Sequence, residues 1–289
     1  MAIALALLSS FLIGITTIIM KKGIDRTNPT SAMLVVTLVS TLIFLVISIP
    51  LVQFNHLKSK AFLLFILAGI FSPALVRWLY FISLDRIGPS VSSSLLSTGP
   101  AFTAILAIIF LKEELTVFIS LGIVLIITGI IILERNINTS AKLVIRKKQD
   151  LIFPLLAALL LGLAIVFRKM GLNILNAPIF GATVGFVTSL VFYSILCLIS
   201  KSMRASISLT RNDILYLSGA GVFLTAGWLA LFYALSLGDA IIVTPLASLY
   251  PVMVVGLSYL FIKDTEKISI KTFSGVIVVL IGVLLITLR

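Results

Sequence analysis

Ten apolar stretches, most of them about as long as a bilayer-spanning helix, follow one another along this chain. An α-helix needs about 20 apolar residues to cross the hydrocarbon core. The stretches are residues 2–20, 31–53, 61–84, 90–111, 117–133, 150–172, 178–200, 214–237, 240–262 and 268–288. Only 11% of the chain is charged and 60% is hydrophobic, whereas soluble domains carry about 25% charged residues. The sequence therefore predicts an all-α integral membrane protein with ten transmembrane helices, multi-pass and located in the plasma membrane.

The charged and reactive residues exclude several classes of function. The net charge is +12, but the basic residues lie almost entirely between apolar stretches, as in loops beside anionic lipids. We therefore expect no nucleic-acid partner. Cys197 and His56 are the only cysteine and histidine, and neither can build a metal or nucleophilic site alone. All ten acidic residues lie at the ends of apolar stretches or in loops, so we expect neither an enzyme nor a bound cofactor or metal.

Two proline-containing stretches resemble each other at an offset of 151 residues. Each carries hydroxyl groups in its first half and a proline near its middle, so that Ser97 matches Ser248 and Pro100 matches Pro251. Further glycines match in the same order along the chain: Gly14 with Gly162, Gly122 with Gly275, and Gly129 with Gly282. Several matches in one order indicate an internal duplication.

The duplication predicts how the chain is divided. We expect a first five-helix repeat at residues 1–133, a basic linker at 134–149 and a second five-helix repeat at 150–289. Because five is an odd number, the second repeat must enter the membrane with the opposite orientation. Inverted repeats are typical of transporters, in which the substrate site lies at the repeat interface near the middle of the membrane.

The hydroxyl groups near the two prolines are the first candidates for a substrate pathway. A proline inside a helix removes one backbone hydrogen bond and frees a carbonyl about one turn earlier. Membranes tolerate such backbone polarity where it faces protein or a water-filled cavity. Close helix packing is the alternative for the small-residue stripe of Ser90, Ser94, Ser97, Ala101 and Ala104. We predict hinges at Pro100 and Pro251, and pathway residues at Ser93, Ser97, Thr98, Thr244, Ser248 and Tyr250.

Arg77 is the one ionisable residue well inside an apolar stretch. Placing a guanidinium there costs about 2.5–3.5 kcal/mol, which favours a role as counter-charge for a carboxylate or phosphate. Extension of the side chain to the interface is the alternative. Trp228 matches Arg77 at the same offset, and we predict both as pathway residues. An interfacial position is the alternative for Trp228 and the expected one for Trp78 and Tyr80.

Basic residues at the ends of the stretches bear on anchoring and orientation. Lys21 and Lys22 close the first stretch, as Arg168 and Lys169 close the sixth. We expect these four at the lipid head groups, with gating of a cavity mouth as the alternative. Loops on one side of the ten-helix arrangement hold 15 Lys and Arg residues against 6 on the other. The positive-inside rule therefore predicts both termini outside the cytoplasm.

Taken in order, these motifs are similar to the drug/metabolite transporter (DMT) superfamily in its ten-helix EamA-type branch. The resemblance rests on five features: the Lys22-Gly23 ending of the first stretch, the segment Arg77–Pro89, the serine-rich helix with Pro100, the segment Glu113–Thr116, and Gly122 with Gly129. It implies a secondary permease that exports amino acids, their derivatives or other small metabolites. It also implies a central cavity lined by the first, third and fourth helices of each half, and both termini in the cytoplasm.

The function predicted from these observations is secondary transport. We expect export or exchange of a small polar metabolite, such as an amino acid or a derivative, by alternating access, with that molecule and the lipid bilayer as partners. Coupling to a proton or to a counter-substrate stays open, as does the oligomeric state. One alternative is an exchanger of anionic solutes that uses Arg77. The other is a membrane enzyme or lipid-handling protein that transports nothing.

Overall fold

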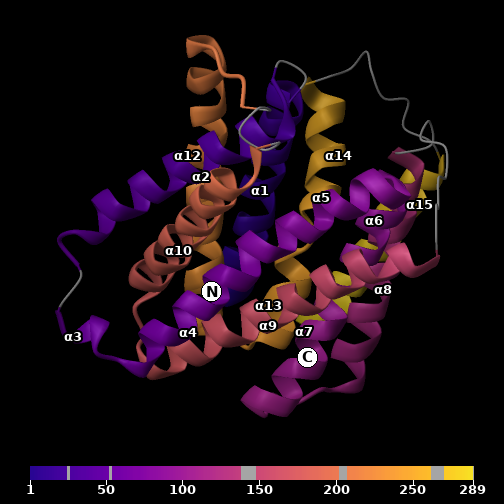
Figure 1. Cartoon of the computed structure of the whole chain (residues 1–289). Coiled ribbons are helices and arrows are strands. Elements are labelled where there is room, and N and C mark those ends of the chain that lie inside the picture. Colours follow the sequence, from indigo (N-terminus) through magenta and orange to yellow (C-terminus); the bar gives the residue numbers. More distant parts are fainter. Residues whose placement is uncertain (25–26, 52–53, 138–147, 202–206, 262–269, 289) are drawn as a thin grey trace.

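The computed structural model describes the chain outside residues 25–26, 52–53, 138–147, 202–206, 262–269 and 289. The described part is helical and contains no strand (Figure 1). Its first half contains α1 (Ala2–Ile24), α2 (Pro29–Ser48), α3 (Phe54–Leu57), α4 (Lys60–Gly69), the π-helical turn η1 (Ile70–Leu75), α5 (Val76–Ile87), α6 (Pro89–Leu96), α7 (Gly99–Leu111) and α8 (Val117–Ile137). Its second half contains η2 (Lys148–Leu151), α9 (Ile152–Ile174), α10 (Pro178–Ile199), α12 (Arg211–Leu237), α13 (Ala240–Ala247), α14 (Tyr250–Phe261) and α15 (Ile270–Thr287).

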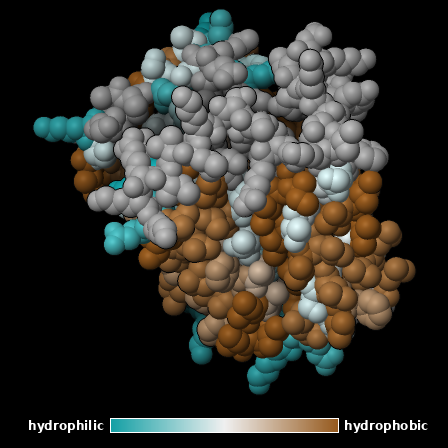
Figure 2. Space-filling view, turned by 90° about the vertical axis from the view of Figure 1, so that its right-hand side faces the viewer, coloured by the Kyte–Doolittle hydropathy of each residue, from teal (hydrophilic) through white to brown (hydrophobic). Residues whose placement is uncertain are grey.

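Eight helical segments of the described residues are long and apolar enough to cross a membrane. They are Ala2–Met20, Pro29–Ser48, Lys60–Leu84, Val91–Leu111, Gln149–Ile174, Pro178–Ile199, Arg211–Leu237 and Ala240–Leu257. Two shorter apolar helices, Val117–Leu133 and Ser274–Thr287, lie within the fifth and tenth predicted stretches. Figure 2 shows a broad hydrophobic band across the visible face, with hydrophilic residues gathered toward its ends. The prediction of an all-helical integral membrane protein is confirmed.

Local sequence explains where several helices begin. The Asn28 side chain accepts a hydrogen bond of 2.9 Å from the Ser31 amide, and Pro29 occupies the first turn of α2. Proline is favoured there because its missing N–H would have no partner within the helix. At the start of α12, Thr210 and Asp213 form a capping box in which each side chain accepts from the other's backbone amide. Both caps satisfy amides that the first helical turn leaves unpaired.

The third predicted stretch, residues 61–84, is not one continuous helix. It consists of α4, η1 and α5, and Ser72 inside η1 has an extended backbone with φ −142° and ψ 129°. The cause is local, because Pro73 disfavours the α conformation for the residue before it. The sequence pattern predicted no break here, but the stretch as a whole, Lys60–Leu84, is long and apolar enough to cross a membrane.

The fourth and ninth stretches are broken at matching positions. The first break separates α6 from α7 at Ser97–Thr98, and the second separates α13 from α14 at Ser248–Leu249. Pro100 and Pro251 each stand second in the helix that follows the break. The Thr98 and Leu249 amides each donate to the carbonyl three residues earlier, at 3.2 Å and 3.3 Å respectively. The backbone therefore turns the same way at both breaks.

Glycines set the closest helix contacts. A Cβ on Gly122 would lie 2.8 Å from the Gly282 carbonyl oxygen, and a Cβ on Gly129 would lie 2.8 Å from that of Gly275. Because the higher-numbered residue of α8 contacts the lower-numbered residue of α15, the two helices run antiparallel side by side (Figure 1). Small residues allow this approach, as is usual for helices in membranes.

A second pair of glycines links α1 and α9 to the helices that follow the breaks. A Cβ on Gly14 would lie 2.9 Å from the Met253 Cβ in α14, and one on Gly162 would lie 3.2 Å from the Phe102 Cβ in α7. Phe102 and Met253 stand at the same offset of 151 as the two prolines. These contacts hold the two broken stretches against the centre of the bundle.

Candidate functional site

The helix breaks and the π-helical turn surround a cavity of about 250 Å³. Six of the predicted stretches supply its walls, namely the first, third, fourth, sixth, eighth and ninth, which are the stretches that the family resemblance implied. Five predicted pathway residues lie in its lining: Arg77, Trp228, Thr244, Ser248 and Tyr250. The other lining residues are Ile13, Ser72, Pro73, Val76, Leu96, Leu161, Ile165, Leu224, Leu231 and Ala247.

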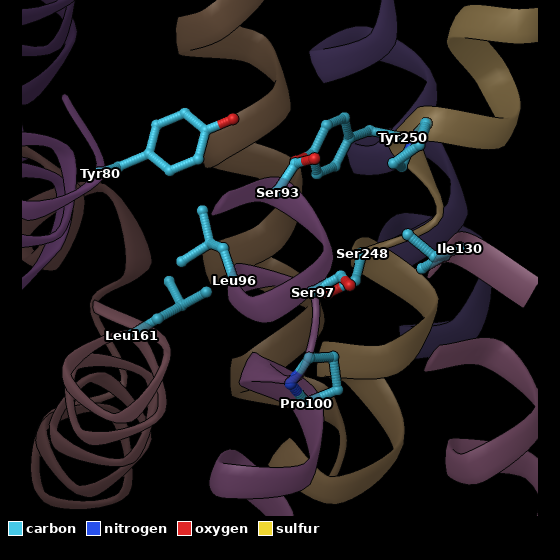
Figure 3. A pocket seen from close by; sticks show the side chains of 10 residues that line it. Tyr80, Ser93, Leu96, Ser97, Pro100, Ile130, Leu161, Ser248 and Tyr250 are labelled. Carbon is cyan, nitrogen blue, oxygen red and sulfur yellow. The ribbon is translucent and has the colours of Figure 1, made fainter. Parts of the chain in front are cut away.

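A smaller cavity of about 120 Å³ adjoins it and shares Leu96, Leu161, Ser248 and Tyr250 with it. Figure 3 shows that hydroxyl groups of both broken stretches reach this smaller cavity, those of Ser93 and Ser97 from one side and Ser248 from the other. The remaining residues of its lining are Tyr80, Pro100, Ile130 and Pro251. The smaller cavity thus brings together both predicted hinges and most of the predicted hydroxyl groups.

The hydroxyl groups at the two breaks donate their hydrogen bonds to backbone carbonyls of their own helices. Ser97 Oγ donates to the Ser94 carbonyl at 2.8 Å, and Ser248 Oγ donates to the Thr244 carbonyl at 2.9 Å. Each hydroxyl oxygen keeps lone pairs that can accept from a bound molecule. Thr98 also donates locally, at 2.7 Å to the Leu95 carbonyl, but it lines neither cavity. The structure thus gives no pathway contact for Thr98.

Arg77 lies in the wall of the larger cavity, near the start of α5. Its Nη1 is buried and, among the described residues, has no hydrogen-bond partner. No carboxylate of the described part of the chain forms a salt bridge with it. This placement favours the cavity-facing interpretation of Arg77 over extension to the membrane interface.

Arg168 is a second buried guanidinium that sequence reasoning placed wrongly. It was expected at the lipid head groups, yet it is only 2% exposed. Its Nη2 donates to the Ser72 carbonyl, and its guanidinium carbon lies 4.6 Å from the centre of the Trp228 ring. The Ser72 backbone is extended at this point. Pro73 is the sequence signal that could have located the break, but not the partner of this carbonyl on α9. Arg168 therefore contacts two residues of the cavity wall, Ser72 and Trp228, without lining the cavity itself.

Lys169 was also expected at the head groups and is also buried, at 9% exposed. Its Nζ donates to the carbonyls of Leu235 and Gly238, both at 2.8 Å, at the end of α12. A cation at this position neutralises the partial negative charge of a helix C-terminus. The side chain has a specific structural partner, so head-group anchoring is wrong for Lys169.

Glu113 binds the other side of the junction between α12 and α13. We call Glu113 and Lys169 together the α12–α13 clamp. Its carboxylate accepts from the Ala240 and Ile241 amides, both at 2.8 Å, at the first turn of α13. Burial raises the pKa of the Glu113 carboxyl above its ordinary value and outweighs these two amides and Lys169, which lower it. Sequence reasoning noted Glu113 only within a family motif and did not foresee this contact.

Aromatic residues divide between the cavity and the lipid-facing surface. Trp228 packs edge-on against Phe186 with ring centres 5.7 Å apart, and it lines the larger cavity. Tyr80 was expected at the interface but lines the smaller cavity, so that expectation is wrong. Trp78 lines neither cavity and is 42% exposed.

Comparisons with known proteins agree with this architecture. The sequence profile of the EamA-like transporter family matches residues 1–135 and 150–288. Over 139 residues the chain is 33% identical to an uncharacterized protein of Methanocaldococcus jannaschii, covering 48% of this chain and 96% of that protein. It is 23% identical to an uncharacterized transporter of Archaeoglobus fulgidus, covering 93% and 91% of the two chains. A crystal structure at 13% identity superimposes with a TM-score of 0.76 over 99% of this chain and 97% of the other.

Proposed function

Because this chain belongs to the EamA-like transporter family, it is a multi-pass membrane transporter rather than an enzyme, and we propose that it moves a small polar metabolite by alternating access. Its partners are the lipid bilayer and a small-molecule substrate. An amino acid or a related compound, exported or exchanged across the plasma membrane, is the proposed cargo. The observation that carries the proposal is the pair of adjoining cavities between the two helix breaks, deep among apolar helices.

The proposed architecture is ten membrane-crossing segments in two inverted repeats, residues 1–133 and 150–289, joined by the linker 134–149. Crosswise glycine contacts support it. Gly122 matches Gly275 in sequence, yet it contacts Gly282, while Gly129 contacts Gly275. A two-fold axis in the membrane plane would exchange the matched residues and carry one of these contacts onto the other.

The contacts of the first helix in each repeat support the same symmetry. Gly14 packs on Met253, and its match Gly162 packs on Phe102. Exchange of the two repeats turns the first contact into the second. The shared cavity then lies where the repeats meet, as expected for a transporter built in this way.

The proposed motion is a rocking of the two repeats about the breaks at Pro100 and Pro251. A proline in the first turn of a helix lacks only an N–H that the helix would not have used. It therefore keeps each break in place without weakening α7 or α14. Ser93, Ser97, Thr244 and Ser248 border these breaks, and we propose that they contact the substrate as the cavity opens to either side.

Counterflow in liposomes tests transport directly. Purified protein is reconstituted and preloaded with amino acids, their deaminated carboxylates or neutral polar metabolites, and labelled solute is added outside. We expect saturable, substrate-dependent counterflow that falls about tenfold when Ser97→Ala and Ser248→Ala are combined. Ser194→Ala is the matched control, because that hydroxyl is exposed on α10 and donates only within its own helix. Absence of counterflow for every solute class would reject the proposed function.

A further inference from the structure

The larger cavity carries a positive charge that the described residues do not neutralise. Arg77 Nη1 is buried and unpaired, and the lining residues include no Asp or Glu. Arg77 as a whole is half-buried, but a single buried N–H donor without a partner is already costly. Its five N–H groups are arranged to bind a carboxylate through two parallel hydrogen bonds. The cavity is therefore incomplete without an anion or water at Arg77.

Arg168 adds a second positive charge directly behind the cavity wall. It is 2% exposed, and its Nη1 also lacks a partner among the described residues. Its two contacts, the Ser72 carbonyl and the Trp228 ring, belong to residues that line the cavity. In a low-dielectric interior this charge reaches further than it would in water. The field at Arg77 thus favours a negative group over a positive one.

The rest of the cavity lining is mostly apolar, with a few hydroxyl groups among the aliphatic side chains. Aliphatic side chains of α1, α5, α6, α9 and α12 form most of the wall, with Trp228 beside them. Two of its hydroxyl residues, Ser248 and Tyr250, also line the adjoining smaller cavity, where Ser97 lies beside Ser248. A bound molecule therefore meets charge at one end and apolar surface along its body.

We infer that the substrate is a small organic monoanion, with a carboxylate bound by Arg77 and an apolar body packed along Trp228 and the aliphatic wall. This inference rests on the proposed transport function, and it narrows the proposed cargo from amino acids and related compounds to those that carry a carboxylate but no amino group. An α-amino group is disfavoured, since no acidic residue of the described lining could pair with an ammonium ion. The Arg77 guanidinium, which lines the cavity, would also repel it. Deaminated carboxylates should therefore bind better than the amino acids with the same skeleton.

Intrinsic fluorescence offers a binding measurement that does not depend on transport. The chain has two tryptophans, and Trp78→Phe removes the exposed one while leaving Trp228 as a reporter in the cavity wall. The probes are 3-phenylpropanoate, phenylalanine and 2-phenylethylamine, which share one body and differ only in their charged groups. We expect 3-phenylpropanoate to bind about tenfold or more tightly than either of the others.

Variants of Arg77 then locate the anion. In the Trp78→Phe background, Arg77→Gln should weaken 3-phenylpropanoate binding about tenfold or more, and Arg77→Lys should lose less because it keeps the charge. Arg86→Gln is the matched control, since Arg86 lies on the same helix but pairs with Asp150 at 2.9 Å outside both cavities. Melting temperatures confirm that each variant is folded.

The outcomes separate this inference from the proposed function. The inference is overturned if 3-phenylpropanoate binds no better than phenylalanine or 2-phenylethylamine, a comparison that needs no Arg77 variant. It is also overturned if a folded Arg77→Gln binds the anion as the parent does. Counterflow of a neutral or zwitterionic solute under those conditions would keep the transport function while rejecting the anionic cargo.

Discussion

At the scale of single residues, the buried charges of this membrane protein are stabilised by backbone groups and rings more than by opposite charges. Lys169 binds two carbonyls at a helix end, and Glu113 binds two amides at a helix start. Arg168 uses one carbonyl and the face of an aromatic ring. Helix termini supply such partners without the cost of burying a second ion. Arg77 differs, because it lines the larger cavity and its Nη1 has no partner among the described residues, and Asp150 differs because it pairs with Arg86.

The α12–α13 clamp gives a stability prediction at this scale. In Glu113→Gln, one carboxylate oxygen becomes an NH₂ group that cannot accept from a backbone amide. We expect the free energy of unfolding to fall by about 1–3 kcal/mol, measured as a lower melting temperature of the purified protein in detergent. Glu114→Gln is the matched control, because the neighbouring Glu114 is exposed and should change little.

The stability difference between the parent protein and Glu113→Gln should depend on pH. Burial raises the pKa of Glu113 in the folded protein above the ordinary value of 4.5, with Lys169 and Asp239 as the neighbouring charges. The folded state therefore binds this proton more tightly than the unfolded state does. The resulting stabilisation is full below 4.5 and is lost as the pH rises through the folded-state pKa. We expect the melting-temperature advantage of the parent over Glu113→Gln to shrink as the pH rises. An advantage that grows with pH would contradict this sign.

At the scale of elements, two kinds of glycine behave differently. Those between α8 and α15 let two backbones approach, and a Cβ on Gly129 would lie 2.6 Å from Val279 Cγ2. Gly219 in α12 has no neighbouring atom within 4 Å of an added Cβ. The intrinsic preference of a helix for alanine over glycine is the same at both sites, so any difference between them measures packing.

Gly129→Ala and Gly219→Ala therefore form a matched test of the α8–α15 contact. We expect Gly129→Ala to destabilise the protein by about 1–3 kcal/mol through overpacking. Gly219→Ala should be neutral or stabilise it by about 0.5–1 kcal/mol. Thermal unfolding of the two purified variants measures both effects. Equal melting temperatures would mean that the two helices separate easily and that their glycine contact adds nothing.

At the scale of the whole molecule, the burial of Arg168 and Lys169 affects the expected orientation. The charge count from the sequence was 15 against 6, and both residues belonged to the smaller number. Both bind protein groups and not lipid head groups, which leaves 4 basic residues on that side. The same criterion removes Arg86, which pairs with Asp150, and leaves 14 on the other side. The positive-inside rule therefore still predicts termini outside the cytoplasm, opposite to what the family resemblance implied.

Cysteine accessibility tests the orientation. Cys197 is the single native cysteine, so Cys197→Ala provides a background in which Ser140→Cys is the only thiol. The charge count predicts that a membrane-impermeant maleimide added to intact cells leaves this thiol unlabelled, and that lysis exposes it. Labelling in intact cells would reject the charge-count orientation and favour termini in the cytoplasm. A cysteine at the N-terminus in the same background should show the opposite pattern.

The sequence by itself determined the membrane class, most of the helices and the two breaks. Hydropathy and proline act locally, because a span of apolar residues and a missing N–H have the same effect in any surroundings. The matching breaks at Pro100 and Pro251 followed from such local chemistry. So did the candidate set of Ser93, Ser97 and Ser248, three residues that the fold brings to one cavity.

Only the tertiary structure decided which polar side chains are buried and what they bind. Glu113 and its partner Ala240 are 127 residues apart, and Arg168 depends on a carbonyl that becomes available because Ser72 is extended. A lysine or arginine at the end of an apolar stretch gives the same sequence pattern whether it binds lipid head groups or the end of another helix. The choice between them is made by the neighbouring helices, because the energy of a buried charge depends on the groups that surround it.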